Sequence, residues 1–157
     1  MRVLGVDLGS RRIGLARSDA SGALATPLTV LERASDHAAD HAGILAVAAA
    51  EGVARIVVGL PLSMSGAEGP AARAARAEVD ELRAATSLPV DLHDERLTTV
   101  SAERRLRESR RGRAKRDPVD AAAAAEMLQS FLDATSARSS RRAALADDPA
   151  RRAGRDR

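Results

Sequence analysis

The amino-acid sequence predicts an α/β fold in which one mixed, five-stranded sheet is flanked by helices. Three apolar segments before residue 32 follow one another too closely for a helix to lie between them, which favours antiparallel neighbours. Two later apolar segments, 55–60 and 88–93, alternate with helical segments, the pattern of parallel strands. With 45% hydrophobic residues, a chain of 157 residues is long enough to bury one core.

The first strand is the apolar run at residues 3–6, which ends in a carboxylate, Asp7. A lone carboxylate in an apolar setting is costly, so we expect it to have a partner, a cation or a chemical role. Turn residues follow from Gly9, and a second apolar segment at 13–16 begins at once. The simplest interpretation is a β-hairpin with a carboxylate near its tip.

Residues 23–31 form the third predicted strand, and Pro27 indicates that it is an edge or bulged strand. Ser35 or Asp36 is the expected N-cap of a helix at 37–50. The next predicted elements are a buried strand at 55–60, a loop at 61–70, a helix at 71–85 with Ala75, Val79 and Leu82 facing inward, a strand at 88–93 and a short charged helix at 100–108.

Asp117 and Pro118 predict the start of the last helix, as N-cap and first helical residue. Asp120 lies in its first turn, and five alanines after it suit close packing on a sheet. We expect this helix to end near Asp133. The Ser-, Arg- and Asp-rich residues 137–157 lack periodicity and predict a disordered tail after a single domain at 1–136.

Composition excludes several functional classes. Without cysteine there is no disulfide, thiolate zinc site or Cys nucleophile. Phe131 is the only aromatic residue, so an aromatic platform for stacking bases is not expected. No segment approaches the roughly 20 apolar residues that span a bilayer, and no signal peptide is recognisable. We therefore expect a cytoplasmic protein that does not associate with membranes.

Positive charge is concentrated at residues 104–116, which hold eight Arg or Lys residues and one Glu. Such a strip indicates contact with the phosphates of a polyanion, in particular a nucleic acid. The tail holds seven Arg and three Asp residues, and we interpret it as a solvated segment.

Three acids are candidates for one metal site: Asp7 ends the first strand, Glu95 follows the last strand, and Asp120 opens the last helix. Carboxylates gathered in one pocket repel one another unless cations neutralise them, and oxygen ligands suit Mg²⁺ or Mn²⁺. Two such ions support phosphodiester hydrolysis. The alternative makes Asp7 a turn residue, Glu95 a surface acid and Asp120 a helix-capping acid.

Other candidates are weaker. His37 and His41 are spaced to bind a metal on one helix face, but a solvated face is the favoured interpretation. His93 lies beside Asp94 and Glu95, so a place near the site and a structural role both stay open. The loop at 61–70 lacks both a nucleophile elbow and the Lys of a phosphate-binding loop.

Four motifs carry a resemblance to a known family. They are GVDLGSRRIGLA at 5–16, VGLP with MSG at 58–66, DERLTT at 94–99, and VD-x-AA with LQSFL at 119–132. In order and spacing, they resemble the YqgF/RuvX family of bacterial proteins over about residues 2–134. The resemblance implies an RNase H-like fold related to the RuvC resolvase. It also implies a nuclease, named in the family both for pre-16S rRNA maturation at the 5′ end and for Holliday junction resolution.

By motif, the resemblance implies that Asp7, Glu95 and Asp120 are the catalytic acids and ligands of two Mg²⁺ or Mn²⁺ ions. Asp117 is expected to cap the helix, with a fourth metal ligand as the alternative. The substrate-binding residues that it suggests are Arg12, Ser63, Ser65, Arg96, Thr98, Thr99, Arg111, Arg113, Lys115 and Arg116.

The leading hypothesis is a metal-dependent hydrolase that cleaves structured RNA, above all the precursor of small-subunit rRNA, as a monomer or a homodimer. Cleavage of branched DNA is the alternative within the same chemistry. A nucleic-acid-binding assembly factor with weak or no catalysis is the alternative from another class. An actin- or hexokinase-type ATPase needs two lobes and a second phosphate motif, for which this chain is too short.

Overall fold

The computed structural model describes residues 1–60, 69–94 and 117–146. Its elements in chain order are β1 (Val3–Leu8), β2 (Arg12–Ser18), β3 (Ala25–Glu32), α1 (His37–Ala50), β4 (Arg55–Gly59), α2 (Pro70–Ala84), β5 (Val90–His93) and α4 (Asp117–Ala146). The strands form one sheet in the order β3-β2-β1-β4-β5. The three N-terminal strands are antiparallel, and β4 and β5 run parallel to β1. The predicted mixed, five-stranded sheet is therefore confirmed.

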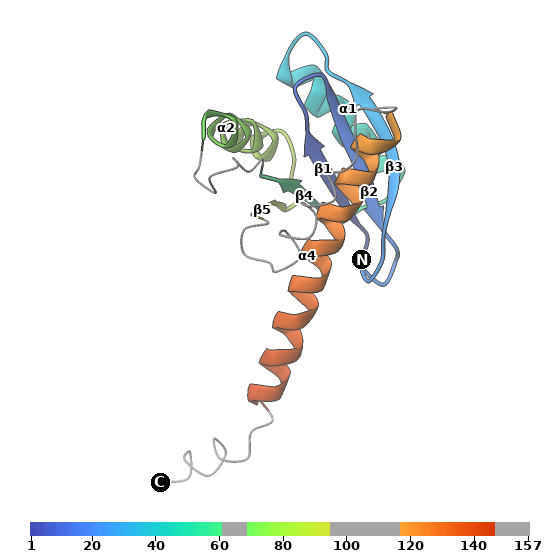
Figure 1. The fold of residues 1–157 in the computed structure, drawn as a ribbon, viewed down its shortest axis with the longest axis vertical. Helices are drawn as coiled ribbons and strands as arrows, with labels where there is room; N and C mark the ends of the chain where they lie inside the picture. Colours follow the sequence, from blue (N-terminus) through green and yellow to red (C-terminus); the bar gives the residue numbers. More distant parts are fainter. Residues whose placement is uncertain (61–68, 95–116, 147–157) are drawn as a thin grey trace, which may run out of the picture.

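The alternation of side chains along the strands separates two cores. One side of the sheet, including Leu4 and Val6, packs against α1 and α2. The opposite side, including Val3 and Val57, packs against α4. Figure 1 shows α4 crossing the sheet on the side opposite to α1. β1 thus contributes to both layers, which fits a sheet covered on both faces.

Glycines let α4 lie close to the sheet. A Cβ atom on Gly5 would stand 2.8 Å from Cβ of Leu128, and one on Gly14 would stand 2.2 Å from the carbonyl oxygen of Asp120. Non-bonded atoms do not approach this closely, so α4 could not pack at this distance from the sheet if Gly5 and Gly14 were larger residues. On the helix side, the buried residues Ala124 and Ala125 give the predicted close packing.

Local signals predicted the β3 and α1 boundaries well. β3 is an edge strand, and its register with β2 shifts next to Pro27, as expected for an edge or bulged strand. Of the two candidate caps of α1, Asp36 is the one used, because its carboxylate accepts a hydrogen bond from the Ala39 N–H at 2.8 Å. In α2 the three residues predicted to face inward are all buried.

The C-terminal boundary differs from the expectation. We predicted disorder from residue 137, whereas α4 continues to Ala146. Ala and Arg are strong helix formers, and Thr135 and Arg138 each donate a side-chain hydrogen bond to the carbonyl four residues earlier. The helix predicted at 100–108 lies outside the described residues.

None of the helices in the described part of the chain combines the length and apolar character needed to cross a membrane.

Candidate active site

Asp7 lies near the end of β1 on the side of the sheet that α4 covers. It is partly exposed, and its Cα partner in β2 is Gly14. Because directly paired residues of antiparallel strands point to the same face, the Asp7 side chain lies on the face where Gly14 meets α4. The burial of Val3 against α4, four residues earlier, agrees with this alternation.

Asp120 reaches the same place from the first turn of α4. Its carbonyl oxygen lies 2.2 Å from where a Cβ on Gly14 would be, and its side chain is 36% exposed. The structure therefore brings Asp7 and Asp120 to neighbouring positions around one glycine. A helix N-terminus adds a positive partial charge there, which favours carboxylates and phosphate oxygens.

Arg12, at the start of β2, contacts two acids. Its Nε lies 3.1 Å from Glu32 Oε1, and its Nη1 lies 4.0 Å from Asp120 Oδ2. A hollow beside these groups is lined, among the described residues, by Gly9, Ser10, Arg11, Arg12 and Asp120. Arg12 therefore lies beside Asp120 at the edge of this hollow, and its contact with a substrate phosphate stays a prediction.

The third predicted acid, Glu95, lies outside the described residues, but the strand before it is well placed. The parallel registers align Val6 of β1 with Val58 of β4 and with Leu92 of β5. Since neighbouring strands are about 4.8 Å apart, β5 lies about 10 Å from β1 at the level of Asp7. The chain therefore runs into Glu95 from the same end of the sheet at which Asp7 stands.

The carboxylates present fit a hard divalent cation by their chemistry, since Mg²⁺ and Mn²⁺ prefer oxygen ligands. Within the described ranges, no group of three His, Asp or Glu side chains is arranged to hold a metal. A complete site would need a ligand from beyond them, and Glu95 is the predicted one. The assignment of the three acids as metal ligands stays a prediction.

The remaining predicted substrate-binding residues also lie outside the described residues. They are Ser63, Ser65, Arg96, Thr98, Thr99, Arg111, Arg113, Lys115 and Arg116.

His93 ends β5 and packs against α4. Its Nε2 lies 3.2 Å from the Ser130 hydroxyl oxygen, and its ring packs against that of Phe131 in a T-shaped arrangement with the ring centroids 5.7 Å apart. Burial, with a smaller contribution from the charge of Arg138, lowers the pKa of His93, and Asp94 opposes this only in part. His93 therefore links the end of β5 to α4, two residues before Glu95.

This lowered pKa predicts how stability depends on pH. The unfolded chain binds a proton at His93 more readily than the folded chain, so His93 favours folding above its ordinary pKa of 6.5 and loses this contribution as the pH falls below that value. We expect the free energy of unfolding to fall less in His93→Gln than in the natural protein between about pH 7.5 and about pH 5.5. Urea denaturation at both pH values measures this difference.

His37 provides the control, because Glu81 raises its pKa. His37→Gln should make the loss of stability on acidification larger rather than smaller. Equal losses in the natural protein and in His93→Gln would show that His93 does not contribute.

The environment of the pair His37 and His41 differs in part from the prediction. His37 is half-exposed, as expected for a solvated face, but the His41 side chain is only 6% exposed. α2 covers it, and the buried Glu78 of α2 lies 3.9 Å from its Nε2. The prediction of a solvated face is therefore wrong for His41, because α1 packs against a helix far away in the sequence.

Sequence reasoning also missed Arg33, the first residue after β3. Its Nε donates a hydrogen bond to the carbonyl oxygen of Gly9 at 2.9 Å, in the turn that follows Asp7. A single Arg after a strand carries no sequence signal for such a contact, since 24 residues separate the partners.

Comparison with known proteins places the chain among nucleases. The family model described as "RuvX: Holliday junction resolvase" matches residues 1–134. A protein from Anaeromyxobacter sp. (strain Fw109-5) is 52% identical over 134 residues, which cover 85% of this chain and 97% of the relative. One from Agrobacterium fabrum is 47% identical over 86% of this chain and 85% of the relative. One from Chloroflexus aggregans is 45% identical over 84% of this chain and 93% of the relative. All three are named "Putative pre-16S rRNA nuclease".

Among solved structures, RuvC of Thermus thermophilus is similar, with a TM-score of 0.53 and 19% identity over 87% of this chain and 97% of RuvC. RuvC of the same organism in complex with a Holliday junction substrate gives a TM-score of 0.52, also with 19% identity, over 86% of this chain and 95% of that chain. At this identity the likeness concerns the fold alone, and the fold is RNase H-like.

Proposed function

Because the chain belongs to the RuvX family of nucleases, and is thereby a hydrolase of phosphodiester bonds, we propose that it cleaves structured RNA with the help of divalent metal ions. The observation that carries this proposal is the convergence of Asp7 and Asp120 around Gly14. Two acidic residues from elements more than 100 residues apart both lie next to Gly14, at the end of the sheet that leads into Glu95.

Asp7, Glu95 and Asp120 would hold two Mg²⁺ or Mn²⁺ ions. Bound there, the metal supplies an activated water and stabilises the leaving oxygen. Arg12 keeps the Asp120 carboxylate oriented from the strand next to Asp7, and its guanidinium can bind a phosphate oxygen of the substrate in the hollow beside it. The N-terminal turn of α4 points its positive end at the same place.

For the substrate we propose the precursor of 16S rRNA, because relatives at 45–52% identity over most of this chain are named "Putative pre-16S rRNA nuclease". Its 5′ end is the part that the resemblance in sequence motifs implies. The Arg-rich strip at 104–116 suits a phosphate backbone and comes directly before α4. Such a role places the protein in the cytoplasm, with a ribosomal precursor as its partner.

Branched DNA is the second candidate, since the family model that matches residues 1–134 is described by Holliday junction resolution. Symmetric cleavage of a junction needs two active sites and hence a homodimer, whereas trimming one rRNA end needs a single site. A monomer would therefore argue against the DNA candidate, whereas a homodimer is compatible with both.

The experiment incubates the full-length protein with labelled precursor rRNA that spans the 5′ end of 16S rRNA. In separate reactions the substrate is a four-way DNA junction. Each substrate is tested with Mg²⁺, with Mn²⁺ and with EDTA. We expect metal-dependent cleavage of the RNA that EDTA abolishes, with weaker or no cleavage of the junctions. Symmetric cleavage of junctions by a dimer would replace the RNA proposal with the DNA one. Binding of precursor rRNA without any cleavage would make the protein an assembly factor.

A further inference from the structure

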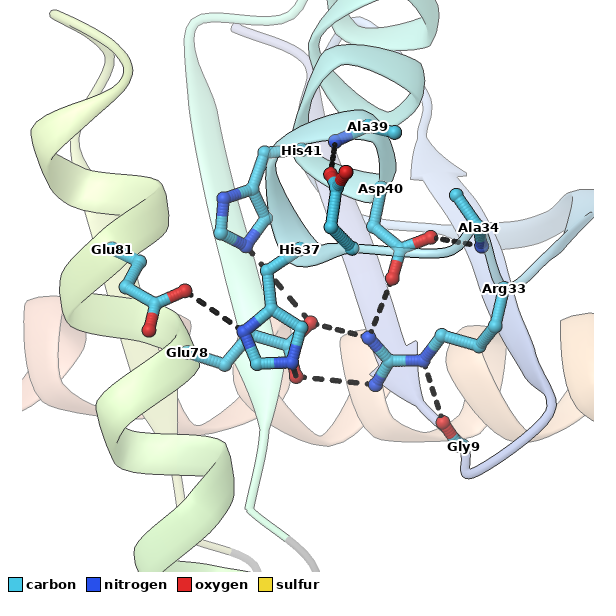
Figure 2. Close-up of polar contacts among 10 residues, drawn as sticks. Gly9, Arg33, Ala34, His37, Ala39, Asp40, His41, Glu78 and Glu81 are labelled. Carbon is cyan, nitrogen blue, oxygen red and sulfur yellow. Dashed lines mark hydrogen bonds and ion pairs between the residues drawn. The ribbon is translucent and has the colours of Figure 1, made fainter.

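A buried ionic cluster lies behind the hairpin that carries Asp7, on the side of the sheet away from α4. Arg33 is its centre (Figure 2), between Asp40 of α1 and Glu78 of α2. Nη1 of Arg33 lies 2.9 Å from Asp40 Oδ2 and 2.5 Å from Glu78 Oε1, and Nη2 lies 3.1 Å from Glu78 Oε2. Both carboxylates belong to residues that are 5% exposed.

The same Arg33 holds the β1–β2 turn (residues 9–11). Its Nε donates to the carbonyl oxygen of Gly9 at 2.9 Å, and its backbone N–H donates to the carbonyl oxygen of Arg11 at 2.9 Å. The turn is closed from within by the Gly9 N–H, which donates to the carbonyl oxygen of Arg12 at 2.9 Å. One residue thus binds both ends of the turn that joins Asp7 to Arg12.

Arg33 and Asp40 are held in their charged forms. Burial by itself would raise the pKa of Asp40, but hydrogen bonds from the Ala34 N–H and from Arg33 outweigh it and keep the pKa below its usual value. Hydrogen bonding to Glu78 raises the pKa of Arg33 in spite of partial burial. The guanidinium therefore remains a charged fork with fixed partners on two helices.

Stability alone is a poor reason for this cluster. A buried ion pair often gives no net gain over well-packed apolar side chains, because both charges lose their hydration. What an apolar substitute could not do is hold the Gly9 carbonyl and both helices with one rigid planar group. The distinguishing feature of Arg33 is therefore geometric.

The histidines beside the cluster do not change this interpretation. The Nδ1 atom of His37 lies within hydrogen-bonding distance of Oε2 of Glu81, at 2.8 Å. The buried Nε2 of His41 has no hydrogen-bond partner among the described residues. These side chains are not arranged to hold a metal within the described part of the chain. In the described part of the chain, Arg33 links this cluster to the turn beside the candidate active site.

We propose that Arg33 is a positioning residue of the nuclease, which sets the β1–β2 turn, and with it Asp7 and Arg12, from the fixed carboxylates of Asp40 and Glu78. This inference rests on the proposed function. Arg33 lies on the opposite side of the sheet from α4 and acts on the metal site through the Gly9 carbonyl. It corresponds to the outer groups that orient metal ligands in other sites, whose loss typically costs about 10- to 100-fold in metal affinity or activity.

The test compares Arg33→Met and Arg33→Lys with the natural protein. We expect the Mg²⁺ concentration that gives half-maximal cleavage to rise about 10-fold or more in Arg33→Met, with the rate partly restored at high Mg²⁺. Lys keeps the charge but is a point donor that cannot bridge Gly9 and both carboxylates, so Arg33→Lys should fold well and still show the shift.

Arg83 is a matched control. Its Nε donates to the carbonyl oxygen of Val90 at 3.0 Å and its Nη1 to Asp80 at 2.8 Å, so it makes the same kinds of contact at the start of β5, away from the active-site end. Arg83→Met should leave the Mg²⁺ dependence unchanged. A second control, Leu82→Ala, removes a buried side chain from the α2 side of the core and should lower the melting temperature without changing the Mg²⁺ dependence.

Backbone amide exchange makes the inference testable apart from activity. In Arg33→Met and in Arg33→Lys the Gly9 amide should exchange faster, and in Arg83→Met it should not, whether or not any substrate is cleaved. If the natural protein cleaved nothing, the proposed function would fail while the exchange data still decided the role of Arg33. Unchanged Gly9 exchange and an unchanged Mg²⁺ dependence in Arg33→Lys would overturn the proposal, as would equal Mg²⁺ shifts in Arg33→Lys and Leu82→Ala.

Discussion

Replacing Asp7 with Asn is expected to reduce cleavage by about 1000-fold or more, which corresponds to about 4 kcal/mol of transition-state stabilisation. Asn has nearly the same shape, so β1 keeps its pairing with Gly14 and the fold persists. What is lost is the negative charge that holds a divalent cation. Single-turnover cleavage of precursor rRNA at saturating Mg²⁺, with circular dichroism as a check of folding, measures the effect.

Asp120→Asn should cause a loss of similar size, and it separates two roles of this residue. Asn supports a helix start about as well as Asp does, so a purely capping role would survive the substitution. Asp133→Asn is the control, since Asp133 is an exposed acid on the same helix that accepts a hydrogen bond from Gln129. Wild-type cleavage by Asp7→Asn or by Asp120→Asn would remove that residue from the metal site.

Replacing Gly14 with Ala is expected to destabilise the protein by about 3 kcal/mol, the upper end of the usual cost of overpacking, because the atoms that the new Cβ meets cannot yield. The added Cβ would stand 2.2 Å from the Asp120 carbonyl oxygen and 2.6 Å from its carbonyl carbon. Both are backbone atoms, so the first turn of α4 must move away from β2. For a chain of this size the melting temperature should fall by about 6–12 °C.

The same displacement should reduce cleavage even well below the melting temperature, because Asp120 moves with its backbone. Gly43→Ala is the matched control: Gly43 lies inside α1, and its new Cβ would meet only a side-chain atom of Leu31 at 3.3 Å. Replacing Gly inside a helix by Ala typically gains about 0.5–1 kcal/mol. A melting temperature of Gly14→Ala within about 2 °C of the natural protein would contradict the close packing of α4.

The local features of the fold were predictable because they depend on neighbours in the sequence. Pro27 marked an edge strand because it lacks an N–H for a ladder. Asp36 capped α1 through an amide three residues away. Ranges such as 55–60 were identified as strands from their apolar side chains alone. The end of α4 was not, since a polar Arg- and Ala-rich stretch is equally compatible with helix and with disorder.

By itself, the sequence determined the five strands and the family, because these reside in local patterns and in motifs of fixed spacing. It also predicted the three acids Asp7, Glu95 and Asp120 as metal ligands. Only the tertiary structure decided which side chains meet: that Asp120 lies against Gly14, that His41 is buried under α2, and that Arg33 reaches Gly9. Strand register and helix packing set such contacts. These contacts join residues that are tens of positions apart in the sequence. At such separations, the number of intervening residues does not indicate how close two side chains are in the folded protein.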